Sequence, residues 1–219
     1  MNRESLVRLA AVVLVAVTAA AAGAAETKHA VAGTAVPASQ VARTLGAKLR
    51  AAGRGEVRIE RVSFDPFTGD PRAVTGTLSL ERPNLASLEF PATGERLTVR
   101  SDGGEWLQPQ LKQMVRFGAP DAAGAARWWT LLLDPTAPGF TARALPDRRY
   151  VLIDTHASSV SDSAWITLAA DGLPVRLEVA EGPGERTLYR FRGWRFLPAR
   201  GRTAFEQKPP RDYQVVQLQ

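Results

Sequence analysis

The stretch that decides the fold runs from Gly76 to Gln113 and reads GTLSLERPNLASLEFPATGERLTVRSDGGEWLQPQLKQ. Apolar residues alternate with polar ones along it, and each alternating run ends at a group of turn-forming residues. Two of these turns are Ala92 to Gly94 and Ser101 to Gly104, where glycine permits positive backbone angles. The stretch therefore predicts consecutive antiparallel strands, and it contains no catalytic motif.

The same period-two pattern continues on both sides of this stretch. It predicts about eleven or twelve strands in all, with turn residues between them. The expected strands are Val57–Phe64, Val74–Glu81, Leu85–Phe90, Glu95–Ser101, Glu105–Gln108, Gln113–Phe117, Thr141–Ala144, Tyr150–Thr155, Ala164–Ala169, Pro174–Ala180, Arg186–Phe196 and Thr203–Glu206.

Two segments have the helical period instead. Ser39 is a candidate N-cap for a helix that continues to about Ala52, on which an apolar residue recurs every fourth position. Asp121–Leu133 is the second helix, with Trp128 and Trp129 on its apolar stripe, and Pro135 ends it. Many strands with few helices predict a mainly β fold with some α, in which helices cover one face of a large curved sheet.

Strand parity separates the two faces of this sheet. Leu78 with Leu80, Leu88 with Phe90, and Leu97 with Val99 share the apolar face, whereas the intervening positions are polar or charged. Parity also places Arg82 on the apolar side, two residues beyond Leu80. An inward guanidinium requires acceptors, which loop carbonyls or a polar group of a ligand would supply. The alternative is an arginine at the strand end that bends into solvent.

The N-terminal 25 residues have the layout of a secretory signal peptide. Arg3 and Arg8 precede an apolar run from Leu9 to Ala22, and small residues follow it, so we expect cleavage near Ala24 or Ala25. A retained N-terminal anchor is the alternative. Residues 26–38 are small and aperiodic and are expected to form a disordered lead-in. Residues 39–219 are then long enough for a single domain with its own core.

Composition narrows the function classes. Removing the signal peptide leaves a net charge of +5, and the arginines are spread along the chain, so a nucleic-acid arm is not expected. The chain has no cysteine, which excludes thiol chemistry, thiolate metal sites and the acylated cysteine of a bacterial lipoprotein. We expect no cofactor and no bound metal.

Several short motifs, taken in order, resemble the periplasmic lipoprotein carrier family called LolA. The order and spacing are similar to that family from Ser39 to Val215. The matching motifs are Gly76-x-Leu78-x-Leu80-Glu81-Arg82-Pro83-Asn84-Leu85, Ser101-Asp102-Gly103, Trp106, Gln113 and Phe205-x-x-x-Pro209-Pro210.

This resemblance implies a half-open β-barrel, closed by an N-terminal helix and a lid helix over an apolar cavity. It implies a monomeric, non-enzymatic periplasmic carrier that takes acylated lipoproteins from an inner-membrane ABC-type transporter to an outer-membrane acceptor. Arg82 matches the arginine that the family uses to hold the lid closed. The expected cavity-lining residues are Leu78, Leu80, Leu88, Phe90, Leu97, Val99, Trp106, Trp128, Trp129, Leu132 and Leu133.

Three alternatives remain at the level of sequence. The nearest is a carrier or sensor of the same fold for another lipid or amphiphile, such as a glycolipid or a free acyl chain, working with a lipid exporter. An enzyme would need acid/base pairs or metal ligands from Asp65 with Asp70, or from His156 with Asp154 and Asp162, although loop acids usually shape turns. A structural envelope protein with a solid core is the third.

Overall fold

The computed structural model describes residues 33–65, 67–118, 129, 132–133, 140–154, 163–180 and 186–217. Val31–Gln219 form one compact unit. The expected signal peptide, most of the expected lead-in and Trp128 lie outside the described residues.

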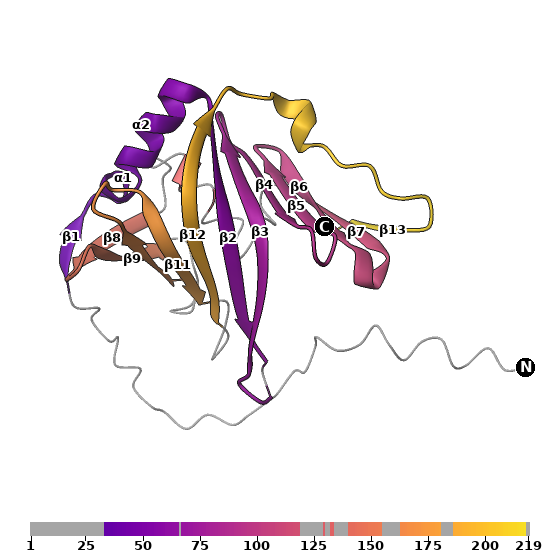
Figure 1. Ribbon diagram of the computed structural model, residues 1–219, viewed down its shortest axis with the longest axis horizontal. Coiled ribbons are helices and arrows are strands. Elements are labelled where there is room, and N and C mark those ends of the chain that lie inside the picture. Colours follow the sequence, from indigo (N-terminus) through magenta and orange to yellow (C-terminus); the bar gives the residue numbers. More distant parts are fainter. Residues whose placement is uncertain are drawn as a thin grey trace, which may run out of the picture. The chain divides into compact units, whose positions relative to one another are not determined.

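The described chain is mainly β, with few helices and one large, curved, unclosed sheet (Figure 1). The strand order is β1-β8-β9-β10-β11-β12-β2-β3-β4-β5-β6-β7-β13, so β1 and β13 are the two edges. The strands are β1 (Thr34–Val36), β2 (Arg54–Phe64), β3 (Pro71–Glu81), β4 (Leu85–Phe90), β5 (Glu95–Arg100), β6 (Gly103–Gln108), β7 (Gln113–Gly118), β8 (Phe140–Leu145), β9 (Arg149–Asp154), β10 (Ser163–Leu168), β11 (Pro174–Ala180), β12 (Arg186–Leu197) and β13 (Gln214–Gln217).

Neighbouring strands are antiparallel, except that β13 runs parallel to β7. Sequential strands from β2 to β7 pair as a meander, and so do the strands from β8 to β12. The two meanders are joined where β12 pairs with β2, from Thr187 opposite Ser63 to Leu197 opposite Arg54. Figure 1 shows β12, β2 and β3 side by side, with β2 between the other two.

Within the described residues the sheet has thirteen strands, more than the eleven or twelve expected from the sequence. Thr34–Val36, placed by the sequence in the lead-in, forms β1 because its backbone pairs with β8, which needs no side-chain periodicity. Gln214–Gln217 forms β13 through its parallel pairing with β7. The strand expected at Thr203–Glu206 is wrong: Arg202–Phe205 forms the 3-10 helix η2, with Phe205 buried. A second 3-10 helix, η1 (Pro109–Leu111), connects β6 to β7.

The N-terminal helical segment is divided in two. Helices α1 (Ala38–Val41) and α2 (Arg43–Ala52) meet at Ala42, and neither has a side-chain N-cap, so the cap expected at Ser39 is wrong. The expected apolar stripe is confirmed, since Val41, Leu45 and Leu49 are buried. α2 ends at Gly53, whose φ of 103° suits glycine. α2 contacts β2 and β12, and α1 contacts β8, which fixes both helices on the sheet (Figure 1).

One hydrophobic cluster fills the space between the helices and the apolar face of the sheet. Leu78 lies opposite Val57 on β2 and Leu88 on β4, and Leu88 lies opposite Leu97 on β5. These cross-strand neighbours continue the same face from strand to strand, as parity predicts. No helix in the described part of the chain is both long and apolar enough to cross a membrane.

Leu80 is fully buried in this cluster, so we expect Leu80→Ala to lower the free energy of unfolding by about 2–5 kcal/mol, because it leaves a cavity. The matched control is Leu111→Ala on η1, where the side chain is 65% exposed and the loss should be small. Denaturant titration of both variants measures the difference. Equal midpoints would contradict this account of the core.

Candidate functional site

Most of the residues expected to line a cavity come together on the apolar face, which we call the inner face. Leu97 is partly buried and packs against the cluster, while Trp106 is 36% exposed and lies at its border. Trp128 lies outside the described residues. The expected lining residues that belong to the buried cluster are Leu78, Leu80, Leu88, Phe90, Val99, Trp129, Leu132 and Leu133.

Trp129 is the largest fully buried side chain of this face. It is helical, as are Leu132 and Leu133. Its ring meets Tyr189 edge-on at 5.0 Å between centroids and Phe191 at 6.2 Å, both on β12. Its indole Nε1–H, however, has no hydrogen-bond partner among the described residues. An unpaired donor in an apolar interior costs about 1–3 kcal/mol, so within the described part of the inner face this nitrogen stands out as an unsatisfied polar atom.

A charged pair sits at the border of the inner face and was missed by the sequence analysis. Arg61 donates two hydrogen bonds to the Glu95 carboxylate, at 2.8 and 2.7 Å, and its guanidinium carbon lies 4.2 Å from the centroid of the Phe90 ring. Trp106 Nε1 donates to the same carboxylate at 3.1 Å. Arg61 shares the parity of Val57 and Ile59, so continued alternation along β2 was the signal that could have found it.

Arg82 is exposed at the turn between β3 and β4. Strand alternation ends at Glu81, so parity no longer directs the arginine inward, and its side chain has no hydrogen bond or ion pair within the described residues. Glu81 instead is the buried charge at this strand end, because its carboxylate accepts hydrogen bonds from the backbone N–H groups of Arg200 (2.8 Å) and Gly201 (2.7 Å). The role of Arg82 in holding a lid stays a prediction.

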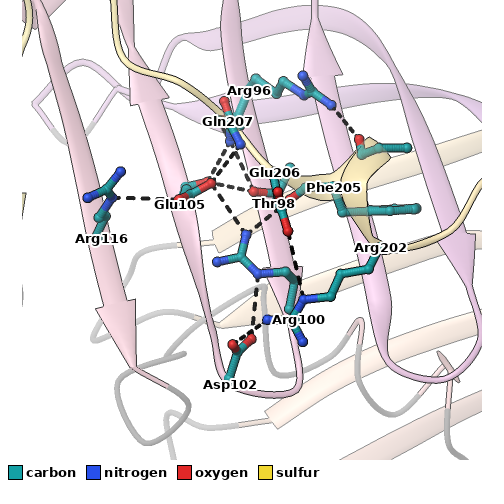
Figure 2. A network of polar contacts seen from close by, with 11 residues as sticks. Arg96, Thr98, Arg100, Asp102, Glu105, Arg116, Arg202, Phe205, Glu206 and Gln207 are labelled. Carbon is teal, nitrogen blue, oxygen red and sulfur yellow. Dashed lines mark hydrogen bonds and ion pairs between the residues drawn. The ribbon is translucent and has the colours of Figure 1, made fainter.

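Residues 198–213, which we call the C-terminal strap, contact the opposite, outer face of β5 and β6 through Ala204, Phe205 and Gln207 (Figure 2). The Gln207 backbone N–H donates to the Glu105 carboxylate at 2.8 Å, and the Gln207 side-chain amide donates to the Glu105 carbonyl at 2.9 Å and to Thr98 Oγ1 at 3.1 Å. Arg100 donates to the Phe205 carbonyl at 3.0 Å and contacts Glu105 at 3.3 Å. These buried hydrogen bonds fasten the strap to the sheet.

Two acids near the surface have lowered pKa values that the structure explains. Asp65 accepts hydrogen bonds from the backbone N–H groups of Phe67 and Thr68, which lower the pKa of its carboxyl, and so it shapes a turn. A hydrogen bond from Arg202 lowers the pKa of Asp102, beside the strap. Among the described residues no group of His, Asp and Glu is arranged to hold a metal ion. His156 and Asp162, named as candidate partners in an active site, lie outside those residues.

Comparison with known proteins gives similarities of structure alone. No protein-family model matches the chain, and neither does any curated protein sequence. An uncharacterized conserved protein from Thermus thermophilus aligns with 83% of this chain and 99% of its own, at 13% identity and a TM-score of 0.47. A LolA superfamily protein from Nitrosomonas europaea aligns over 78% and 98% of the two chains, at 10% identity and a TM-score of 0.44.

A putative outer membrane lipoprotein-sorting protein domain from Vibrio parahaemolyticus aligns over 76% of this chain and 94% of its own, at 12% identity and a TM-score of 0.45. The structural neighbours thus include LolA superfamily proteins and a lipoprotein-sorting domain, at low sequence identity. With TM-scores below 0.5, these similarities do not by themselves assign a ligand or a function to this chain.

We expect Glu105→Gln to loosen the C-terminal strap, because the amide that replaces the carboxylate cannot neutralise Arg100, which is only 13% exposed. The free energy of unfolding should fall by about 1–3 kcal/mol, and trypsin should cut faster within the strap. The matched control is Glu206→Gln, an exposed strap residue whose carboxylate forms a long, 3.9 Å ion pair with Arg202. Identical cleavage rates at Arg211 in both variants would contradict the fastening role of Glu105.

Proposed function

We propose that the protein is a non-catalytic periplasmic carrier, which shields the acyl chains of lipoproteins and moves them from the inner membrane to the outer membrane. An inner-membrane ABC-type transporter would supply the cargo and an outer-membrane acceptor would receive it. Support comes from the sequence motifs around Arg82 and Phe205, and from an unclosed sheet whose inner face is apolar and covered by helical residues.

The observation that carries this proposal is the unpaired indole N–H of Trp129. The side chain is 1% exposed, Tyr189 and Phe191 lie against its ring, and its indole N–H has no hydrogen-bond partner among the described residues. An acyl chain bears an ester or amide carbonyl at its head, and this acceptor could pair with the indole while the methylenes contact the apolar cluster. A protein that only needed a solid core would be more stable with an apolar ring at this position.

A carrier must bind acyl chains and release them again, and the free energies of these two steps fit a covered apolar face better than a tightly sealed cavity. Each methylene taken from water gains about 0.8 kcal/mol, so two or three acyl chains bind with tens of kcal/mol of gross free energy. A carrier must also release its cargo, and therefore some of that free energy has to be offset. To admit a ligand, Trp129, Leu132 and Leu133 would have to leave the buried cluster, and the free energy that this costs would oppose binding.

The direct experiment extracts lipid from the protein purified from a bacterial envelope and identifies it by mass spectrometry. We expect acylated material to co-purify, and diacylated or triacylated peptides would identify a lipoprotein carrier. A glycolipid or free fatty acid in their place would support the alternative carrier working with a lipid exporter. Protein that is empty after purification, and that also fails to take up acylated peptide in vitro, would overturn both.

We expect Trp129→Phe to lower the amount of retained acyl cargo several-fold while changing the melting temperature little, because the lost ring volume is offset by removal of the unpaired donor. The matched control is Trp194→Phe, since the Trp194 indole already donates to the Pro174 carbonyl at 2.9 Å. That variant should lose stability and keep its cargo. If Trp129→Phe retained its cargo and Trp194→Phe lost it, the Trp129 indole would not be a contact for cargo.

Arg82 provides a separate test of lid control. If its guanidinium stabilises the closed, empty form, then Arg82→Leu should retain cargo and transfer less of it to an acceptor in vitro. Arg148→Leu, a change at another exposed arginine in a turn, is the control for loss of charge. Unchanged transfer by Arg82→Leu would leave the arginine as a solvent-facing residue at the end of β3.

A further inference from the structure

A polar groove of about 390 Å³ lies on the outer face, at the junction of β3, β2 and β12. It is lined by three arginines, one glutamate and small residues, and it lies across the sheet from the apolar cluster. The lining residues are Glu56, Val57, Arg58, Thr77, Arg192, Gly193 and Arg195.

A β-bulge builds this groove. Arg192 and Arg195 are three positions apart, so regular alternation would send them to opposite faces. The register of β12 shifts between them, and both therefore lie opposite outer-face residues of β2, Arg192 opposite Arg58 and Arg195 opposite Glu56. Gly193, with a φ of 73°, occupies the bulge, and a Cβ there would meet open space. Sequence alternation alone could not reveal this arrangement.

Two of the three arginines have no counter-charge among the residues that the structure describes. Arg195 forms an ion pair with Glu56, which also accepts from Arg54 at 2.7 Å. By contrast, neither Arg58 nor Arg192 has a hydrogen bond or ion pair within the described part of the chain.

The nearest carboxylates are already engaged. Glu60 pairs with Arg190 at 2.8 Å, and Glu89, the neighbour of Thr77 on β4, pairs with Arg96 at 3.2 Å. Like charges directly opposite each other on adjacent strands destabilise a sheet, so the Arg58 and Arg192 pair requires another explanation.

We propose that this groove binds a phosphate group, held by the guanidinium groups of Arg58 and Arg192. Each guanidinium offers several N–H donors in a planar fork that matches two phosphate oxygens, and together the two cations neutralise a dianion. Thr77, which also lines the groove, adds a hydroxyl donor. The site is independent of the inner face, so it does not rest on the proposed carrier function. Phosphate could come from a soluble ion or from a lipid headgroup at a membrane surface.

The test measures inorganic phosphate binding by calorimetry at low ionic strength, for the purified protein and for R58Q/R192Q. We expect the double variant to bind at least tenfold more weakly, with an unchanged or higher melting temperature. The matched control is R50Q/R211Q, which removes the same charge from exposed positions outside the groove and should bind normally. R58K/R192K keeps the charge but loses the forks, and it should give intermediate affinity.

Vesicles of phosphatidylcholine, with and without phosphatidylglycerol, distinguish the two sources. Binding to phosphatidylglycerol vesicles that is lost in R58Q/R192Q and kept in R50Q/R211Q would assign the site to a lipid headgroup. Phosphate binding with no vesicle binding would assign it to a soluble phosphate. Absence of phosphate binding by the unmodified protein, or equal phosphate affinity in the two glutamine double variants, would overturn the proposal.

Discussion

The pairing of β12 with β2 is the interaction on which the rest of the structure depends. These strands are far apart in sequence: Arg190 on β12 contacts Glu60 on β2, and 130 positions separate the two residues. Each meander can form through local hairpins, but only this long-range pairing makes them one sheet. The same junction carries the α2 contacts on one face and the arginine groove on the other, so both proposed binding regions are positioned by it.

Much of the sheet could be predicted from the sequence because its strands follow a two-residue period and end at turn residues. The pattern in Gly76–Gln113 predicted β3 to β7 closely, and the inner-face parity of Leu78, Leu88 and Leu97 is observed. β1 and β13 were missed because backbone pairing with a neighbouring strand creates them, not side-chain alternation. The strand expected at Thr203–Glu206 failed because a buried phenylalanine also anchors a 3-10 turn.

The candidate site was predictable only in its apolar part. Burial of Trp129, Leu132 and Leu133 followed from helical spacing, whereas the unpaired indole depends on three-dimensional surroundings that no spacing encodes. The alternation of β3 was extended to Arg82 in the sequence-based prediction, but β3 ends at Glu81 and the backbone no longer alternates in the turn that follows. The arginine groove could not be predicted because β12 contains one extra residue at the Gly193 bulge. From there to the end of β12, side chains point to the opposite face from the one that simple alternation predicts.

An unclosed sheet leaves two rims of unpaired backbone, and here both rims are very short. β1 has three residues and β13 has four, so each presents few free N–H and C=O groups to another molecule. Long, flat rims invite strands from other chains and lead to fibrils, and brief rims resist this. The chain has no cysteine and therefore no disulfide to stabilise it. Its short edge strands would limit edge-to-edge pairing between copies of the protein, even though one face of the sheet is apolar.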